Sequence, residues 1–142
     1  MPDFSKWESE LLERNRVARL ATVDENSNPH VVVIVYAFDG KRIFTPIDEK
    51  PKKVPYRKLR RIRNIENNKA VSLLVDEYFE DWSGLAWVQV RGRAEILECG
   101  KNHSLGIKLL NEKYEQYAVM NLDDKPLIVI YPVKIVSWRA SQ

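Results

Sequence analysis

Apolar and polar residues follow one another along this chain in patterns that predict six β-strands. Between residues 16 and 23 the side chains alternate, as they do in a strand with one buried face. The run HVVVIVYAF at 30–38 is continuous and β-branched, which is typical of a strand buried on both faces. Asp39-Gly40 predicts a hairpin turn directly after it. The predicted strands cover residues 16–23, 30–38, 42–45, 70–76, 85–97 and 126–138.

Three further segments repeat their apolar residues every three or four positions, which predicts helices at about 3–15, 57–68 and 101–117. Ser5-Lys6-Trp7-Glu8 fits a capping box at the start of the first helix. Leu59, Ile62 and Ile65 form the apolar stripe of the second. The class is therefore α+β, mainly β. Six mostly antiparallel strands favour a closed or nearly closed barrel, because closure removes exposed strand edges.

Two positions are expected to interrupt the regular strands. Gly92 stands between Arg91 and Arg93, which predicts a bend or a close backbone approach. Pro132 lies within the last strand, which indicates an edge or a bulge. The length of 142 residues predicts one domain, with the N-terminal helix at about 3–15 and the barrel at about 16–139.

Composition argues against several classes of protein. The one cysteine, Cys99, excludes a disulfide within the chain and indicates a reducing compartment. His30, expected at a strand edge, and His103, expected at the surface, form no zinc motif with it, so we expect no metal site. The chain begins without a secretory signal and has no run of about 18 apolar residues. We therefore expect a cytoplasmic protein that does not bind a membrane.

The distribution of charge is more informative than the net charge of +3. Residues 50–63, KPKKVPYRKLRRIR, carry eight basic residues and no acid, while the rest of the chain carries 15 basic and 20 acidic residues. Such a cluster fits an anionic partner as well as it fits a solvated basic face. A phosphate held between the Thr45 hydroxyl, Lys58 and Arg61 is physically sensible, since a helix begins there.

Aromatic residues form a second cluster, in the segment EYFEDWSGLAW. Tyr78, Phe79, Trp82 and Trp87 can stack on a planar ligand, although packing explains them somewhat better. The chain has no G-x-S-x-G, Walker, G-x-G-x-x-G or H-E-x-x-H motif. Cys99 lies beside Glu98, which disfavours a reactive thiolate. If the protein is an enzyme, a bound cofactor is expected to carry the chemistry.

Several segments taken in order resemble one family. VARLATVDENSNPHVVVIVYAFDGKRIFTPIDEKPKK, RKLRRIRNIENN, AVSLLVDEY, DWSGLAWVQVRGRAEIL and the closing VSWRAS are similar to the pyridoxamine-phosphate-oxidase-like split β-barrels, from about residue 16 to 139. TPIDEKPK with KLRRIRNI is most similar to the branch that uses the deazaflavin coenzyme F-420. The resemblance implies a six-stranded Greek-key barrel of the FMN-binding type and a homodimer with a cofactor cleft at each end of its interface.

The resemblance also implies a set of cofactor-binding residues. A hydroxyl residue ending the third strand and basic residues entering the next helix would bind the phosphate, with Arg61 where the family often has Lys. Valines of the second strand would lie along the ring, with aromatic residues nearby. The expected set is Thr45, Pro46, Lys52, Arg57, Lys58, Arg61, Asn64, Val33, Val35, Tyr36, Trp82 and Trp87.

These observations predict an oxidoreductase that transfers a hydride between F-420 and an unidentified small organic substrate. No side chain is expected to act as a nucleophile, and Tyr36 is a candidate proton donor. Lys50, Lys52, Lys53 and Arg57 favour F-420 over FMN, because the F-420 tail carries several carboxylates. FMN remains the alternative cofactor, a cofactor carrier without turnover is another, and a nucleic-acid-binding module using residues 50–63 is the rival of a different class. No sequence-specific nucleic acid is expected as a partner.

Overall fold

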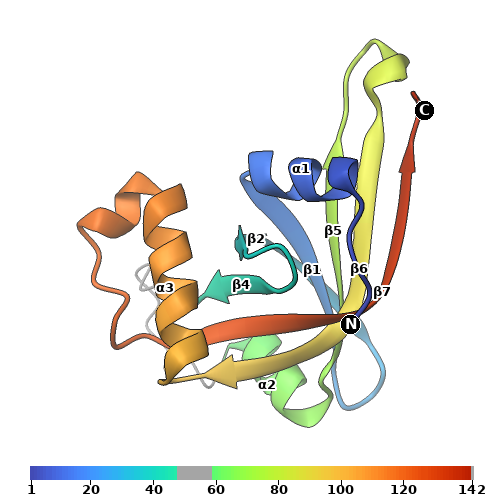
Figure 1. Ribbon diagram of the computed structural model, residues 1–142. Coiled ribbons are helices and arrows are strands. Elements are labelled where there is room, and N and C mark those ends of the chain that lie inside the picture. Colours follow the sequence, from blue (N-terminus) through green and yellow to red (C-terminus); the bar gives the residue numbers. More distant parts are fainter. Residues whose placement is uncertain (48–58, 142) are drawn as a thin grey trace.

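An antiparallel sheet that curls around its own core dominates the protein (Figure 1). The computed structural model describes residues 1–47 and 59–141. Within them the strands are β1 (Val17–Val23), β2 (Pro29–Val35), β3 (Ala37–Phe38), β4 (Ile43–Pro46), β5 (Ala70–Glu77), β6 (Ala86–Leu97) and β7 (Leu127–Arg139). Their order across the sheet is β2-β1-β5-β6-β7-β4-β3, and every neighbouring pair is antiparallel. The predicted α+β class with an antiparallel split-barrel sheet is confirmed, and the sheet is curled into a half-barrel.

The sheet has seven described strands where six were predicted, because the run 30–38 divides at Tyr36. Before Tyr36 the chain pairs with β1, and after it the chain pairs with β4. Tyr36 lies between these two pairings, and its N–H donates to the Tyr114 hydroxyl at 3.1 Å. The division therefore depends on a tyrosine 78 positions away, which the local pattern does not reveal.

Three α-helices lie against the described sheet: α1 (Lys6–Arg14), α2 (Arg60–Asn67) and α3 (Lys101–Lys113). The capping box of α1 is confirmed, since Ser5 N–H donates to Glu8 at 2.7 Å and Glu8 N–H donates to Ser5 Oγ at 3.3 Å. The third helix ends earlier than predicted, and a short 3₁₀ turn (Glu115–Ala118) follows it. None of the helices in the described ranges has the length and apolarity to cross a membrane.

The core has two parts, one inside the curl and one under α3. Inside the curl, α1 and α2 pack on the inward side chains of the strands, with Leu11, Leu12, Ile62 and Ile65 buried. The second part lies between α3 and the β3–β4–β7 side of the sheet. His103 of α3 is 4% exposed, and its Nε2 lies 2.6 Å from the Lys125 carbonyl oxygen. The prediction of a surface His103 was wrong. The imidazole is buried, and its hydrogen bond to the Lys125 carbonyl replaces a hydrogen bond to water.

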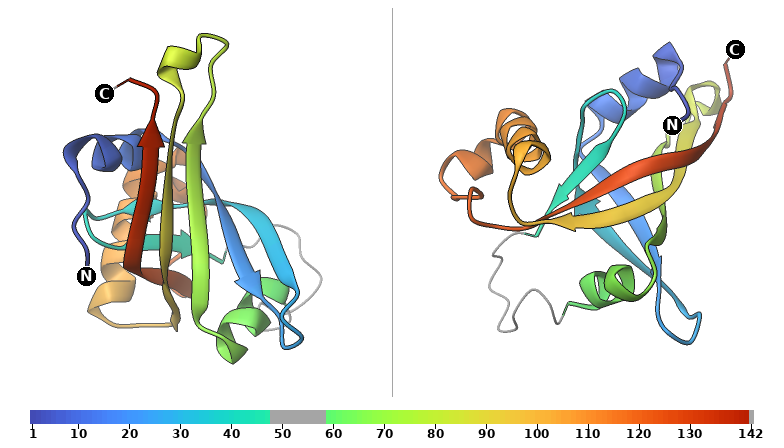
Figure 2. Two further views of the ribbon diagram at one scale, coloured as in Figure 1. Left: turned by 90° about the vertical axis from the view of Figure 1, so that its right-hand side faces the viewer. Right: turned by 60° about the horizontal axis from the view of Figure 1, so that its bottom comes forward.

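The long strands β5 and β6 have two different ends (Figure 1). The lower end in that view lies beside α2, and the upper end continues into a loop with a 3₁₀ turn (Trp82–Gly84). Figure 2 shows the same hairpin from the side, with the loop beyond the body of the sheet and beside the C-terminus. Predicted site residues lie close together only where they belong to the same end of these strands.

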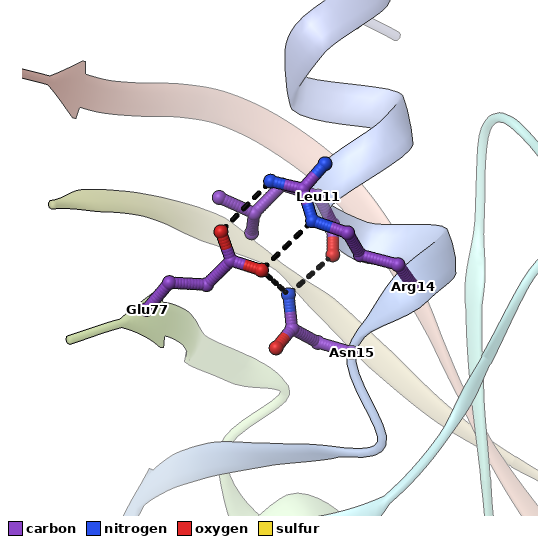
Figure 3. Close-up of polar contacts among 4 residues, drawn as sticks. All are labelled: Leu11, Arg14, Asn15 and Glu77. Carbon is purple, nitrogen blue, oxygen red and sulfur yellow. Dashed lines mark hydrogen bonds and ion pairs between the residues drawn. The ribbon is translucent and has the colours of Figure 1, made fainter. Parts of the chain in front are cut away.

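A polar cluster attaches α1 to the upper end of β5 (Figure 3). Arg14 donates two hydrogen bonds to the Glu77 carboxylate, both at 2.8 Å. The Asn15 amide donates to the same carboxylate at 2.9 Å and to the Leu11 carbonyl at 2.7 Å. The bond from Arg14 is the main reason why the pKa of Glu77 is lowered from its ordinary value.

The interruption predicted at Gly92 and Pro132 is confirmed. The register of β6 and β7 shifts between Arg91 and Gly92, so that Arg91 faces Lys134 while Gly92 faces Pro132. A Cβ at Gly92 would come within 2.6 Å of the Tyr131 carbonyl oxygen, so a side chain there would collide with backbone. Val133 is the extra residue of this bulge.

Candidate functional site

A cavity of about 610 Å³ opens on the outer face of the sheet, at the end beside α2. Its volume is in the usual range for small-molecule sites. Ala21, Ser72 and Arg91 are successive partners across β1, β5 and β6, and they share the face opposite the buried residues. The lining residues are Ala21, Thr22, Val23, Pro29, Asn68, Lys69, Ala70, Val71, Ser72, Arg91, Gly92, Arg93 and Val133.

The chemistry of this lining favours binding an anion with an apolar body. Small and apolar residues supply most of the surface, and Ser72 supplies a hydroxyl. Lys69, Arg91 and Arg93 are cationic, and none of the described lining residues is acidic or a histidine. The cavity is therefore equipped to bind and orient a ligand rather than to carry general acid–base chemistry.

Thr22 and Asn64 connect the cavity to α2. Both are almost completely buried, and the Asn64 amide nitrogen lies 3.0 Å from Thr22 Oγ1. Asn64 Oδ1 is buried and has no hydrogen-bond partner among the described residues. In the reverse orientation of the amide, the Thr22 hydroxyl donates to Oδ1, and the two amide hydrogens are then available to a phosphate oxygen. A buried amide that can serve as a donor fits the predicted phosphate site.

The described part of the basic segment lies on α2. Ile62 and Ile65 are buried and Leu59 packs on the same core, so the predicted apolar stripe is confirmed. Arg61 is half-buried, whereas Arg60 and Arg63 are exposed. Hydrogen bonds, first that from the Asn28 N–H, lower the pKa of Asp24, and the charge of Arg60 adds a smaller effect.

Thr45 and Pro46 end β4 in the interior. Both are buried, and Thr45 is 1% exposed. Thr45 shares a face of β4 with Ile43, which packs in the same core cluster as the apolar stripe of α2. The predicted site residues Lys52, Arg57 and Lys58, with Lys50 and Lys53, lie outside the described residues.

The three predicted residues of the second strand have different environments. Val33 is 66% exposed on β2, at the edge of the sheet, and Val35 is half-buried. Tyr36 is fully buried, and its hydroxyl donates to the Leu12 carbonyl at 2.5 Å. Burial raises the pKa of Tyr36 above its ordinary value. Only the two valines therefore have surface that a ligand can contact.

Trp82 and Trp87 lie at the other end of the sheet from α2. Trp82 is 66% exposed in the β5–β6 loop, and Trp87 is half-buried beside Trp138 of β7. Ala70, at the cavity, and Glu77, before the loop, are separated by the length of β5, which is roughly 23 Å at about 3.3 Å a residue. One copy of the chain thus does not bring the two tryptophans to Arg61 and Asn64.

Sequence analysis missed the cavity residues Lys69, Ser72, Arg91 and Arg93 as members of a site. A signal was present, because Arg91 and Arg93 flank the glycine that predicted a close backbone approach. What the sequence did not show was the register, which places Ser72 opposite Arg91 and Ala70 opposite Arg93.

Comparison with known proteins identifies the family. The family model described as pyridoxamine 5'-phosphate oxidase matches residues 6–141, nearly the whole chain. The chain belongs to the pyridoxamine 5'-phosphate oxidase family. No curated protein matches it.

Solved structures of this oxidase-family fold carry different descriptions. A FAD-binding protein from Mesorhizobium loti is 25% identical, with a TM-score of 0.67 over 96% of this chain and 95% of that one. A protein named F420 reductase is 24% identical, with a TM-score of 0.66 over 94% and 98%. HutZ, the haem storage protein of Vibrio cholerae, is 18% identical, with a TM-score of 0.73 over 97% and 95%. Proteins whose descriptions name FAD, F420 and haem therefore share this fold.

Proposed function

We propose that this chain is an oxidoreductase that binds coenzyme F-420 and transfers a hydride between it and a small organic substrate. The observation that favours this function is the apolar cavity with a cationic rim, placed on the outer sheet face beside the basic helix α2. Family membership and the similarity to a protein named F420 reductase support it. FMN is the alternative cofactor, in keeping with the FAD-binding relative.

The residues near α2 would hold the phosphate end of the cofactor. Arg61 supplies charge, Asn64 supplies amide hydrogens, and Thr45 and Pro46 end the strand from which the basic segment departs. Lys52, Arg57 and Lys58 belong to the same proposed set. Val33 and Val35 would lie along the ring. When bound, the cofactor supplies the hydride chemistry, and the chain binds it, orients it and excludes water.

Tyr36 is not part of the proposed site. Its hydroxyl is committed to the Leu12 carbonyl in the core, and the raised pKa opposes loss of its proton. A proton for the second substrate would therefore come from another donor or from solvent.

A second copy of the chain would cover the outer face of the sheet. Large apolar side chains are exposed there or at its edge: Val17, Val31, Val33, Val133 and Trp138. Exposed apolar surface of this kind marks an interaction site in soluble proteins. We propose a homodimer formed through this face, as the family resemblance implies.

The ends of the sheet indicate how the two copies would be oriented. The β5–β6 loop carries Glu80 and Asp81, whereas the opposite end carries the cations of the cavity and of α2. A two-fold axis running across the strands brings unlike ends together, and an axis along the strands brings like charges together. The first arrangement also moves Trp82 of the partner subunit toward the cavity, which would complete the cofactor-binding set.

Binding measurements on one preparation test this function against its rivals. We expect F-420 to bind more tightly than FMN, with the difference shrinking as salt is raised, because its tail carboxylates would meet the lysines of the segment 50–58. An oligonucleotide should bind weakly, with Kd of about 10⁻⁴–10⁻⁶ M at physiological salt. Stoichiometric FMN that F-420 cannot displace would contradict the choice of cofactor, and a nanomolar, sequence-selective nucleic-acid complex would contradict the class. Binding of F-420 without reduction of any substrate would indicate a carrier.

A further inference from the structure

Two cations stand directly opposite each other on the outer face of the sheet. Arg91 of β6 is the register partner of Lys134 of β7, and both side chains are exposed. Like charges at directly opposed positions destabilise a sheet. Among the described ion pairs no carboxylate contacts either residue, and the described side-chain hydrogen bond of Arg91 goes from its Nε to Gln89 at 3.2 Å. This positive charge is therefore uncompensated within the described chain.

The bulge lies at the cavity, which Arg91 lines and Lys134 adjoins as the register partner of Arg91. Val133, the extra residue, is 68% exposed and lines the cavity together with Arg91. On the other side of Arg91, its β5 partner Ser72 also lines the cavity and offers a hydroxyl. An apolar wall, a hydroxyl and the Arg91 cation thus meet at one rim, and Lys134 is the register partner of Arg91 beside it.

The remaining cations of the cavity are already partly neutralised. Lys69 Nζ lies 3.0 Å from the Glu95 carboxylate, and Arg93 Nε lies 3.6 Å from its other oxygen. Because one carboxylate serves both Lys69 and Arg93, the charge still available to a ligand is concentrated at Arg91 and Lys134.

We propose that Arg91, Lys134 and Ser72 bind the acidic group of a small organic anion whose apolar body lies against Val133, the wall of the cavity beside Arg91. A guanidinium and an ammonium donate charge-assisted hydrogen bonds to a carboxylate, sulfonate or phosphate, and a serine hydroxyl donates a further one. The class of ligand is therefore an aromatic or aliphatic acid, not a neutral molecule. In assigning this acid as the second substrate of the F-420 reaction, the inference rests on the proposed function.

The test uses two probes with nearly the same apolar body, of which one is charged. 8-Anilinonaphthalene-1-sulfonate carries a sulfonate, and N-phenyl-1-naphthylamine is neutral. Each is titrated by fluorescence into the wild-type protein and into the double variant Arg91→Gln/Lys134→Gln. The matched control is Lys101→Gln/Lys108→Gln, which removes two exposed charges from α3.

We expect the double variant to bind the sulfonate roughly tenfold more weakly, and the neutral probe and the α3 control to be unchanged. Equal losses for both probes, no loss for the sulfonate, or an equal loss in the α3 control would overturn the proposal. A changed mass in light scattering with unchanged sulfonate affinity would assign the pair to the dimer interface and overturn it as well.

F-420 titration of the same variants separates this inference from the proposed function. We expect Arg91→Gln/Lys134→Gln to weaken F-420 binding much less than sulfonate binding, because the phosphate end of F-420 is assigned to Arg61 and Asn64 of α2. A large loss of F-420 affinity would make the pair part of the cofactor site and overturn its assignment to the substrate. If the wild type binds neither F-420 nor FMN yet discriminates between the two probes, the proposed function fails while the anion site stands.

Discussion

The amide of Asn64 in α2 lies 3.0 Å from the hydroxyl of Thr22 in β1, and both side chains are shielded from solvent. This hydrogen bond connects the basic helix α2 to β1, a strand that lines the cavity. A buried amide that loses its partner keeps the full cost of its desolvation.

We expect Thr22→Val to lower the free energy of unfolding by about 1–3 kcal/mol, because it leaves the Asn64 amide without this partner. Thr22→Ser keeps the hydroxyl and should cost less. Urea unfolding of both variants, followed by circular dichroism, measures the difference. A Thr22→Val variant that is as stable as Thr22→Ser or more stable would contradict the prediction, because the hydroxyl would then contribute no more than the methyl group.

Arg61→Glu should weaken F-420 binding by about 2–4 kcal/mol, because it removes a charge-assisted bond to the phosphate and adds repulsion. Arg63→Glu is the matched control, since Arg63 is exposed on the same helix and the charge change is the same. Calorimetry on both variants checks this. If the fold is intact and the two variants bind alike, Arg61 is not a phosphate ligand.

Local patterns were sufficient to predict most of the fold. The capping box at Ser5, the stripe of α2 and the bulge at Gly92 depend on neighbouring residues, and all three were predictable. The division of the second strand at Tyr36 was not, because it depends on the distant Tyr114 hydroxyl. Long-range pairing is invisible to a local periodicity.

The candidate site was predictable at the level of residue types but not of location. The basic cluster and the aromatic cluster were both evident in the sequence, but the described part of the basic cluster, on α2, and the aromatic cluster lie at opposite ends of β5 and β6. The cavity itself is made by the register of β1, β5 and β6, which sets Ala21, Ser72 and Arg91 in one row. That register is a property of the folded sheet.

Val33→Glu should dissociate the proposed dimer, because Val33 is 66% exposed on the face that a second copy would cover. Val119→Glu is the control, since Val119 is 90% exposed just after the 3₁₀ turn near α3. Light scattering should give a dimer for the wild type and the control and 16.6 kDa for Val33→Glu. A wild type that is monomeric at micromolar concentration would contradict the dimer.

Glu77 should make stability sensitive to acid. The hydrogen bond from Arg14 lowers the pKa of Glu77, so the stabilisation is present above the ordinary value near 4.5 and is lost as the pH falls below it. Glu77→Gln should cost about 1 kcal/mol at pH 7, and the difference from wild type should shrink as the pH falls below 4.5. Glu80→Gln, an exposed loop residue, is the control and should change little. A Glu77→Gln difference that persists at low pH would contradict the ionic origin of the stabilisation.

Lys113 should make the free energy of unfolding rise with pH above pH 8. Its ammonium lies 3.9 Å above the Tyr36 ring, and burial, followed by the charge of Arg16, lowers the pKa of Lys113 to about 8 from 10.5. Above pH 8 the unfolded chain therefore holds more protons than the folded one, so the free energy of unfolding rises with pH. Near pH 10 the rise should end, because burial raises the pKa values of Tyr36 and Tyr114, and these tyrosines ionise first in the unfolded chain.

Lys113→Met should remove the rise between pH 8 and 10. Lys108→Met should keep it, since Lys108 is exposed on the same helix. Urea unfolding at intervals over this pH range measures both variants. If the free energy of unfolding of the wild type does not change between pH 8 and 10, the pKa of Lys113 is not lowered in the folded protein.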